Sequence, residues 1–177
     1  MLGPTTSPIG SPVGSQNMPL TDPEKNKFQI GFSLMMSGAP AQAYRIFKDL
    51  SKKPNISVQF NLALCYAIMG NHQEAVRLLE KVLQMMPTSP TEPVNDDVYL
   101  KLRPTEKKNA DYRSPFQLEL PVALPQFARE CVRRCLIDSY RELEDWDKVR
   151  SIAAMVKEDG FDNVAYAVSE ADASRGN

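Results

Sequence analysis

The chain has 177 residues with 21 basic and 22 acidic side chains, a net charge of −1. A charge this close to zero attracts neither nucleic acid nor an anionic membrane surface, and the apolar runs are too short to span a bilayer. With 42% hydrophobic residues the chain can bury the core of one domain, and its three cysteines do not suit a disulfide framework. We therefore expect a cytoplasmic protein with no nucleic-acid or membrane partner.

The N-terminal segment differs in composition from the rest of the chain. Residues 1–20 are rich in Gly, Pro and Ser, carry no charge and show no periodicity, which predicts a disordered tail. Thr21 and Glu24 then stand at capping-box spacing, with Pro23 in the first turn, so a helix is expected to begin here. A single domain is expected over residues 21–177.

Two helical hairpins follow in tandem. The first is expected to turn at Gly38, just before Pro40, and the second at Gly70. Equivalent positions of the two hairpins lie 32 residues apart, namely Gly31 and Ala63, Leu34 and Tyr66, Gly38 and Gly70, Ala43 and Ala75, Phe47 and Leu79. Self-similarity at a fixed period of this length predicts stacked repeats rather than two unrelated hairpins.

The pattern of residues resembles the tetratricopeptide repeat. Residues 56–87 carry its residue types at Leu62, Ala63, Tyr66, Gly70, Ala75, Leu79 and Pro87, and residues 24–54 match well. A third copy, about 130–160, matches less closely because Glu144 replaces the turn glycine and Val149 the small alanine. The resemblance implies an all-α, right-handed helical solenoid of about three helix pairs. An amphipathic segment at about 162–171 is expected to form its C-terminal capping helix.

Residues 88–124 interrupt the repeats. Seven prolines lie in or beside this segment and argue against a further helical repeat, so a long non-helical insertion is expected. Two stretches of alternating residues, 97–102 and 116–120, are compatible with a small β-hairpin. The alternative is an ordered loop that lies on the solenoid.

Residues able to carry chemistry are few. His72, the only histidine, is expected as a solvated side chain in the first turn of a surface helix, without a partner for acid–base catalysis. Cys65, Cys131 and Cys135 lack the paired spacing of a zinc site and are expected to be buried structural thiols. We therefore expect no enzyme activity, no cofactor and no metal. An enzyme with a thiol or metal site is the alternative.

The resemblance implies a protein or peptide partner, bound in a concave groove that first-helix side chains line in this family. By repeat position the groove residues are Phe28, Phe32, Met35, Met36, Phe60, Asn61, Leu64, Ile68, Arg134 and Arg141. The apolar members are expected to seat the apolar anchors of a peptide or helix, and the two arginines to favour an acidic flank. The expected role is that of a scaffold, an adaptor or a chaperone-like protein.

Two other interpretations of the groove stay open. A three-repeat chain of this length also resembles the type III secretion chaperones that hold translocator segments in a hydrophobic groove, although the insertion argues against it. Alternatively, residues 116–124 carry the anchors needed to fill the groove from within the chain. We expect the rings of Phe28, Phe32 and Phe60 to be exposed, as a free groove requires. The sequence leaves the partner's identity, the pathway and the oligomeric state open.

Overall fold

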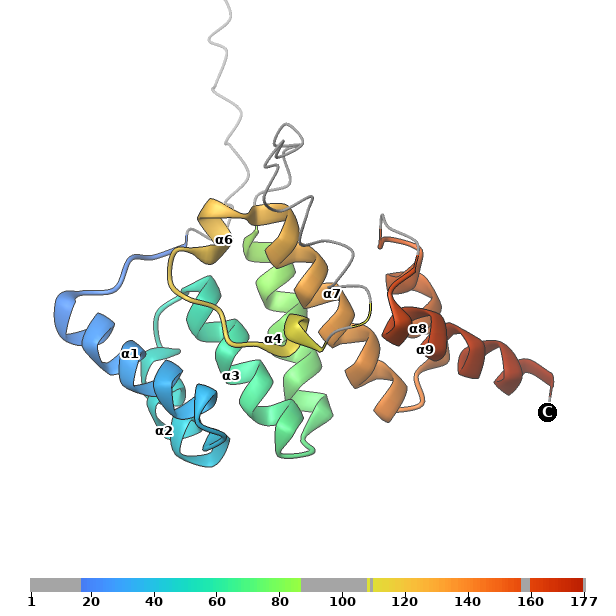
Figure 1. Ribbon diagram of the computed structural model, residues 1–177, viewed down its shortest axis with the longest axis horizontal. Coiled ribbons are helices and arrows are strands. Elements are labelled where there is room, and N and C mark those ends of the chain that lie inside the picture. The colour runs from blue at the N-terminus through green and yellow to red at the C-terminus, as the bar shows by residue number, and fades with distance from the viewer. Residues whose placement is uncertain (1–16, 87–107, 109, 157–159, 177) are drawn as a thin grey trace, which may run out of the picture.

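The computed structural model describes residues 17–86, 108, 110–156 and 160–176, and within these ranges all regular secondary structure is helical. Three hairpins stand side by side (Figure 1): α1 (Asp22–Met36) with α2 (Pro40–Leu50), α3 (Ile56–Ile68) with α4 (His72–Met85), and α7 (Pro125–Glu142) with α8 (Trp146–Ala153). The last helix, α9 (Asp162–Ala173), packs on α7 and α8 and is followed by a short 3₁₀ turn, η2 (Ser174–Gly176). The prediction of an all-α helical solenoid is confirmed.

Side-chain caps define where α1, α3 and α4 begin. Thr21 and Glu24 form the predicted capping box, in which the Thr21 N–H donates to Glu24 Oε2 at 2.8 Å. Asn55 and Asn71 start α3 and α4, because their side-chain oxygens accept from the N–H groups of Val58 and Glu74. These contacts satisfy donors that the first turn of a helix leaves unpaired.

The end of the predicted tail is ordered against the second hairpin. The Met18 N–H donates to the Pro54 carbonyl at 2.7 Å, and Asn55 Nδ2 donates back to the Met18 carbonyl at 3.0 Å. Asn17 accepts from the Ile56 N–H, and Leu20 is buried. The prediction of disorder is therefore wrong for residues 17–20, because Asn17 and Met18 hydrogen-bond to the solenoid and Leu20 packs in its core. Residues 1–16 lie outside the described residues.

Small residues let the helices of each hairpin cross closely. Ala43 and Ala75 are fully buried, and a Cβ added at Gly31 would lie 3.0 Å from the Phe47 ring. Val149 takes the equivalent place in the third hairpin and is also fully buried. Ile30, in contrast, is 55% exposed because α1 has no preceding hairpin in the described chain to pack against, whereas its counterpart Leu62 is buried.

The turn of each hairpin requires a left-handed backbone. Gly38 and Gly70 have φ values of 76° and 79°, and Glu144 takes the same place in the third hairpin with φ 56°. Glycine adopts this region freely, whereas a residue with a Cβ is strained there by about 1–2 kcal/mol. The chain therefore keeps the geometry of the repeat at Glu144 although the residue type is lost.

Replacing Glu144 by glycine should stabilise the fold. Relief of the left-handed strain is partly offset by the greater backbone entropy of glycine in the unfolded chain, so we expect a gain of about 0.5–1 kcal/mol in the free energy of unfolding. Ser151→Gly, at an exposed position inside α8, should instead lose about 1 kcal/mol. Denaturant unfolding of the two variants measures both effects, and a loss of stability in both would contradict the turn geometry.

The insertion leaves the stacking of the hairpins intact, because α4 packs directly on α7. Its described part contains a 3₁₀ turn, η1 (Asp111–Arg113), and a short helix, α6 (Leu120–Ala123). The prediction of a wholly non-helical insertion is therefore wrong here, since Pro121 lies in the first turn of α6, where proline is compatible with a helix. Residues 116–120 form no strand, and residues 97–102 lie outside the described residues.

Candidate functional site

Part of the predicted groove is occupied by the chain itself. Residues 112–118, which we call the strap, run from η1 to α6 across the first helices of the second and third hairpins, α3 and α7 (Figure 1, yellow). Phe60 is consequently fully buried, and Phe32 is half-buried. Phe28 is buried for a different reason, given below. The expectation that these three rings are exposed is wrong for Phe28 and Phe60, and self-occupation is the interpretation that the burial of Phe60 supports.

Asn61 holds the backbone of the strap. Its Nδ2 donates to the Phe116 carbonyl at 2.9 Å, and its Oδ1 accepts from the Phe116 N–H at 2.7 Å. One turn earlier on α3, Ser57 Oγ donates to the Gln117 carbonyl at 2.9 Å. These side chains thus satisfy backbone groups that a neighbouring strand would otherwise pair, which explains why residues 116–120 need no sheet.

An aromatic stack with Phe60, the residue before Asn61 on α3, also holds Phe116. The rings of Phe60 and Phe116 lie 3.6 Å apart, centroid to centroid, and are nearly parallel, at 14°. Both side chains are buried to 1% exposure or less. Face-to-face rings gain little from their quadrupoles, so the attraction comes chiefly from apolar burial and dispersion.

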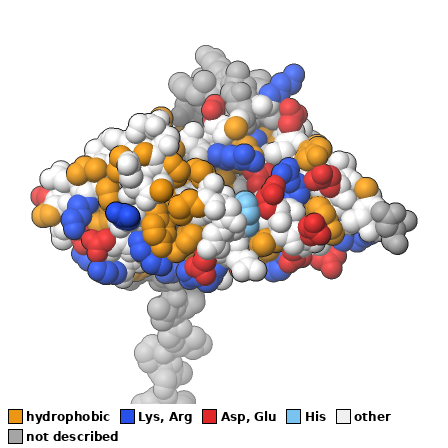
Figure 2. Space-filling model, turned by 90° about the horizontal axis from the view of Figure 1, so that it is seen from below, with side chains coloured by type: hydrophobic (Ala, Val, Ile, Leu, Met, Phe, Trp, Pro, Cys, Tyr) orange, Lys and Arg blue, Asp and Glu red, His pale blue; other side chains and the backbone are white. Residues whose placement is uncertain are grey.

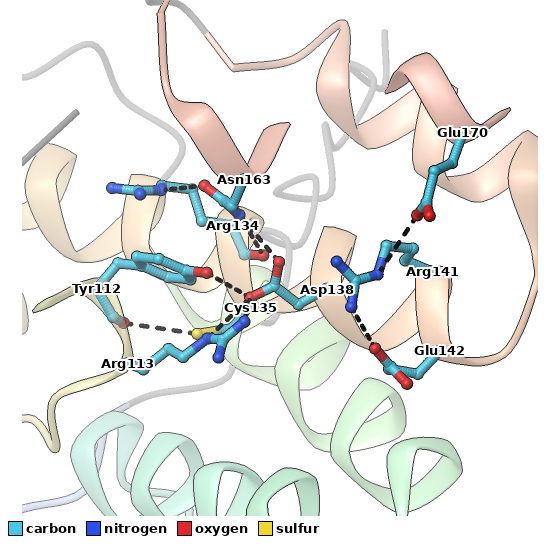
Figure 3. A network of polar contacts seen from close by, with 9 residues as sticks. All are labelled: Tyr112, Arg113, Arg134, Cys135, Asp138, Arg141, Glu142, Asn163 and Glu170. Carbon is cyan, nitrogen blue, oxygen red and sulfur yellow. Dashed lines mark hydrogen bonds and ion pairs between the residues drawn. The ribbon is translucent and has the colours of Figure 1, made fainter. Parts of the chain in front are cut away.

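The N-terminal end of the strap is held by a carboxylate on α7. Asp138 Oδ2 accepts from the Tyr112 hydroxyl at 2.5 Å and from Arg113 Nη2 at 2.7 Å, as Figure 3 shows. Its Oδ1 accepts from Asn163 Nδ2 of α9 at 3.0 Å. Burial and the negative charge of Asp138 raise the pKa of Tyr112 above its ordinary value, so this phenol stays a proton donor. Cys135 Sγ lies 3.5 Å from the Tyr112 carbonyl.

Arg134, predicted to attract an acidic ligand, is instead engaged in contacts with other residues of the fold. Its guanidinium lies between two rings, 3.8 Å from the centroid of Tyr112 and 4.2 Å from that of Phe161. Its Nε donates to Asn163 Oδ1 at 2.8 Å, and the residue is buried. Cation–π stacking and burial of this kind leave no guanidinium face for a ligand. The prediction of a ligand-facing Arg134 is therefore wrong.

Arg141 is also engaged, although it is partly exposed. It forms an ion pair with the neighbouring Glu142 and a longer one, at 3.8 Å, with Glu170 of α9. In Figure 3, Arg141 and Glu142 lie beyond Asp138 along α7, and Glu170 approaches Arg141 from α9. An acidic ligand would have to compete with two carboxylates that the chain already supplies.

Two further predicted groove residues belong to the interior of the first hairpins. Phe28 packs edge-on against Phe47 of α2 at a centroid distance of 5.6 Å, and Met35 Sδ lies 3.3 Å from Cys65 Sγ of α3. Successive residues are about 100° apart around a helix, so an error of one position moves a side chain from the groove to the core. Met36, by contrast, is 63% exposed at the end of α1.

Part of the groove stays open beside the strap. A cavity of about 280 Å³ has an apolar wall from α3 (Ala63, Leu64, Ala67 and Ile68) and a polar wall that includes Arg113, Cys135, Asp138, Ser139, Arg141 and Glu142. His72 and Leu79 of α4 complete the lining. Leu64 is buried, whereas Ile68 is 60% exposed at the rim. Leu64, Ile68 and Arg141 are thus the predicted groove residues that line open space.

Figure 2 views the molecule from the end at which the hairpins turn. Orange hydrophobic side chains gather beside the pale blue histidine, which is His72, the only one in the chain. His72 is half-buried, and its Nδ1 is buried with no hydrogen-bond partner. It is therefore not the solvated side chain expected, because the third hairpin stacks against α4.

The cysteines, also considered for chemistry, lie in the interior, and Cys135 contributes to the wall of the open cavity. All three cysteines are buried and free, as predicted, and burial raises the pKa of the Cys65 thiol to about 12. No group of three or more His, Cys, Asp or Glu in the described ranges is placed to hold a metal ion. A second cavity, of about 490 Å³ between α8 and α9, contains none of the predicted groove residues.

Ser57 and Tyr112 were not indicated by any motif. The available signal is indirect: Ser57, Gln59 and Asn61 are polar residues in an otherwise apolar helix, and all three are buried. A helix that is apolar all round is expected to be buried, and its polar members then need partners. Gln59 finds one in the Ser51 carbonyl, and the other two find theirs in the strap.

Stacked hairpins with close small-residue crossings define a helical-repeat protein. Residues 56–89 match the family model of the tetratricopeptide repeat, which spans α3, α4 and the turn between them. This match supports the resemblance to tetratricopeptide-repeat proteins that the residue pattern indicated. Comparison with curated proteins and with solved structures gave no match.

The repeat also indicates a general class of function. Tetratricopeptide repeats generally mediate protein–protein interactions, and the family is generally non-catalytic. None of the described helices has the combined length and apolarity needed to cross a membrane.

Proposed function

We propose that the chain is a non-catalytic interaction module that binds a peptide or helix of another protein in the open part of its concave groove. The observation that carries this proposal is the cavity of about 280 Å³ between α3 and α7, with Ile68 60% exposed at its rim. This volume lies near the lower end of ligand pockets, so it suits one or two side-chain anchors of a partner rather than a fully buried segment.

Exposed apolar side chains lie at the cavity and beyond it. Ile68 lines the cavity, Met69 follows it as the C-cap residue of α3, and Met36 is exposed at the end of α1, outside the cavity lining. Methionine side chains repack around different apolar groups at little cost. The exposed Ile68 at the rim, next to the charged wall of α7, favours a ligand with an apolar anchor and a polar flank. Because the methionines can adapt their shape, we expect a loose preference for the sequence of the ligand.

A displayed library of random peptides tests the proposal. Selected peptides should bind the wild type and lose about tenfold or more in affinity for Ile68→Glu, because the carboxylate would be buried unpaired beneath the anchor. Ile30→Glu is the matched control, since Ile30 is 55% exposed on α1 and lines no part of the cavity. Selection of no peptide, or an equal effect of the two substitutions, would overturn the proposal.

A further inference from the structure

We infer that the strap is an intramolecular ligand and that the partner segment that binds in this groove has side chains of the same kinds as the strap. The partner segment would be extended, with an aromatic residue in the place of Phe116 and a tyrosine–arginine pair three to four residues before it. It would displace the strap from Asn61 and Asp138. This inference rests on the proposed function and names the class of partner for the same groove.

The backbone contacts of the strap are independent of its sequence. Asn61 pairs with both the N–H and the carbonyl of Phe116, and Ser57 pairs with the Gln117 carbonyl. All three bonds join a side chain of α3 to the backbone of the strap. Any extended segment presents the same N–H and carbonyl groups, so another chain can make these bonds equally well.

The side-chain contacts supply selectivity. Phe60 offers a flat apolar face for an aromatic ring, and Asp138 offers a carboxylate that accepts from a phenol and a guanidinium. The nearby arginines of α7 keep partners when the strap leaves: Arg134 stacks on Phe161 and donates to Asn163, and Arg141 pairs with two glutamates. The groove therefore suits a basic and aromatic ligand rather than the acidic flank expected from the sequence.

The open cavity gives an entering segment access to the contacts of the strap. Arg113 and Asp138 both line the cavity, so a cation bound there meets the Asp138 carboxylate directly. The Arg113 side chain is 54% exposed, so solvent screens its ion pair with Asp138 and weakens this contact. Displacement can begin at Arg113 and proceed toward Phe116, whose ring is buried.

The strap lowers the apparent affinity of the groove for any competitor. If the groove is open in only a fraction of molecules, the apparent dissociation constant rises by the inverse of that fraction. Weakening the strap without altering α3 or α7 should therefore increase the affinity for an added peptide. Phe116→Leu keeps an apolar side chain but loses the ring stack, and Phe116→Asp places a charge opposite Phe60.

The test uses the full chain and a synthetic peptide of residues 110–119, with binding measured by fluorescence anisotropy. Affinity should increase from wild type to Phe116→Leu to Phe116→Asp, with a total gain of about tenfold or more. Peptides that carry Phe116→Ala or Arg113→Glu should bind the Phe116→Leu chain at least about tenfold more weakly than the natural sequence. If Phe116→Asp does not unfold cooperatively, Phe116→Leu alone decides the comparison.

Three results would overturn the inference. Equal affinity of wild type and folded Phe116→Leu would mean that the strap does not compete. Equal binding of the natural and Arg113→Glu peptides would mean that the side chains of the strap do not indicate which ligand the groove prefers. A wild-type dimer in light scattering that the Phe116 substitutions abolish would mean that the strap serves a second copy of this chain. Each of these results would leave the proposed function standing, provided that displayed peptides bind the wild type and lose affinity for Ile68→Glu.

Discussion

Phe116→Ala is expected to lower the free energy of unfolding by about 3 kcal/mol. Truncation of a buried phenylalanine typically costs 3–5 kcal/mol, because apolar burial is lost and a cavity remains. The lower figure applies here because the strap is able to leave the groove. The loss of stability therefore cannot exceed the free energy with which the strap docks on α3 and α7. Val122→Ala, in the same insertion but 72% exposed, should change the stability by less than about 0.5 kcal/mol.

Denaturant unfolding of the two variants measures this difference. Hydrogen exchange adds the location: Phe116→Ala should accelerate exchange in the strap and in the part of α3 that it covers, but leave α2 unchanged. Equal stability of Phe116→Ala and Val122→Ala would contradict the packing of Phe116 on Phe60.

Asn61→Ala is expected to cost about 2 kcal/mol, since it removes both hydrogen bonds to the Phe116 backbone. A buried group that loses its partner costs about 1–3 kcal/mol, and release of the strap to water recovers part of this loss. The double variant Asn61→Ala/Phe116→Ala should therefore lose clearly less than the sum of the two single variants, because either one releases the same segment.

Gln59→Ala provides the matched control for this cycle. Gln59 is a buried amide on the same helix, and its Nε2 donates to the Ser51 carbonyl at 3.0 Å, away from the strap. Its effect should add to that of Phe116→Ala within about 0.5 kcal/mol. Additivity of Asn61→Ala with Phe116→Ala would show that the two residues do not act on one docked segment.

The architecture could be predicted from the sequence because it depends on local and periodic features. Gly38 and Gly70 occupy left-handed turns, and Ala43 and Ala75 are fully buried at the helix crossings. Each of these constraints acts within one hairpin and recurs in the next, so a period of 32 residues reveals it. Even Glu144 keeps the conformation of the turn, since stacking of the hairpins determines it.

The occupancy of the groove could not be predicted in the same way. Asn61 and Phe116 are 55 residues apart, and no periodicity relates them. The alternation of residues 116–120 was compatible with a strand as well as with an ordered loop, and the backbone partners come from side chains of α3. Arg134 was expected to face a ligand because its position in the repeat is visible, whereas the rings that enclose it come from the insertion and from Phe161, before α9.

Hydrogen exchange at the Phe116 amide in the free wild-type chain tests most directly whether the strap occupies the groove. This N–H is buried and donates to Asn61 Oδ1 at 2.7 Å. We expect slow exchange that becomes fast in Asn61→Ala, because the acceptor of this N–H would be lost while the hairpins remain folded. Exchange at the rate of an unprotected chain in the wild type would contradict a docked strap and leave the groove open along α3.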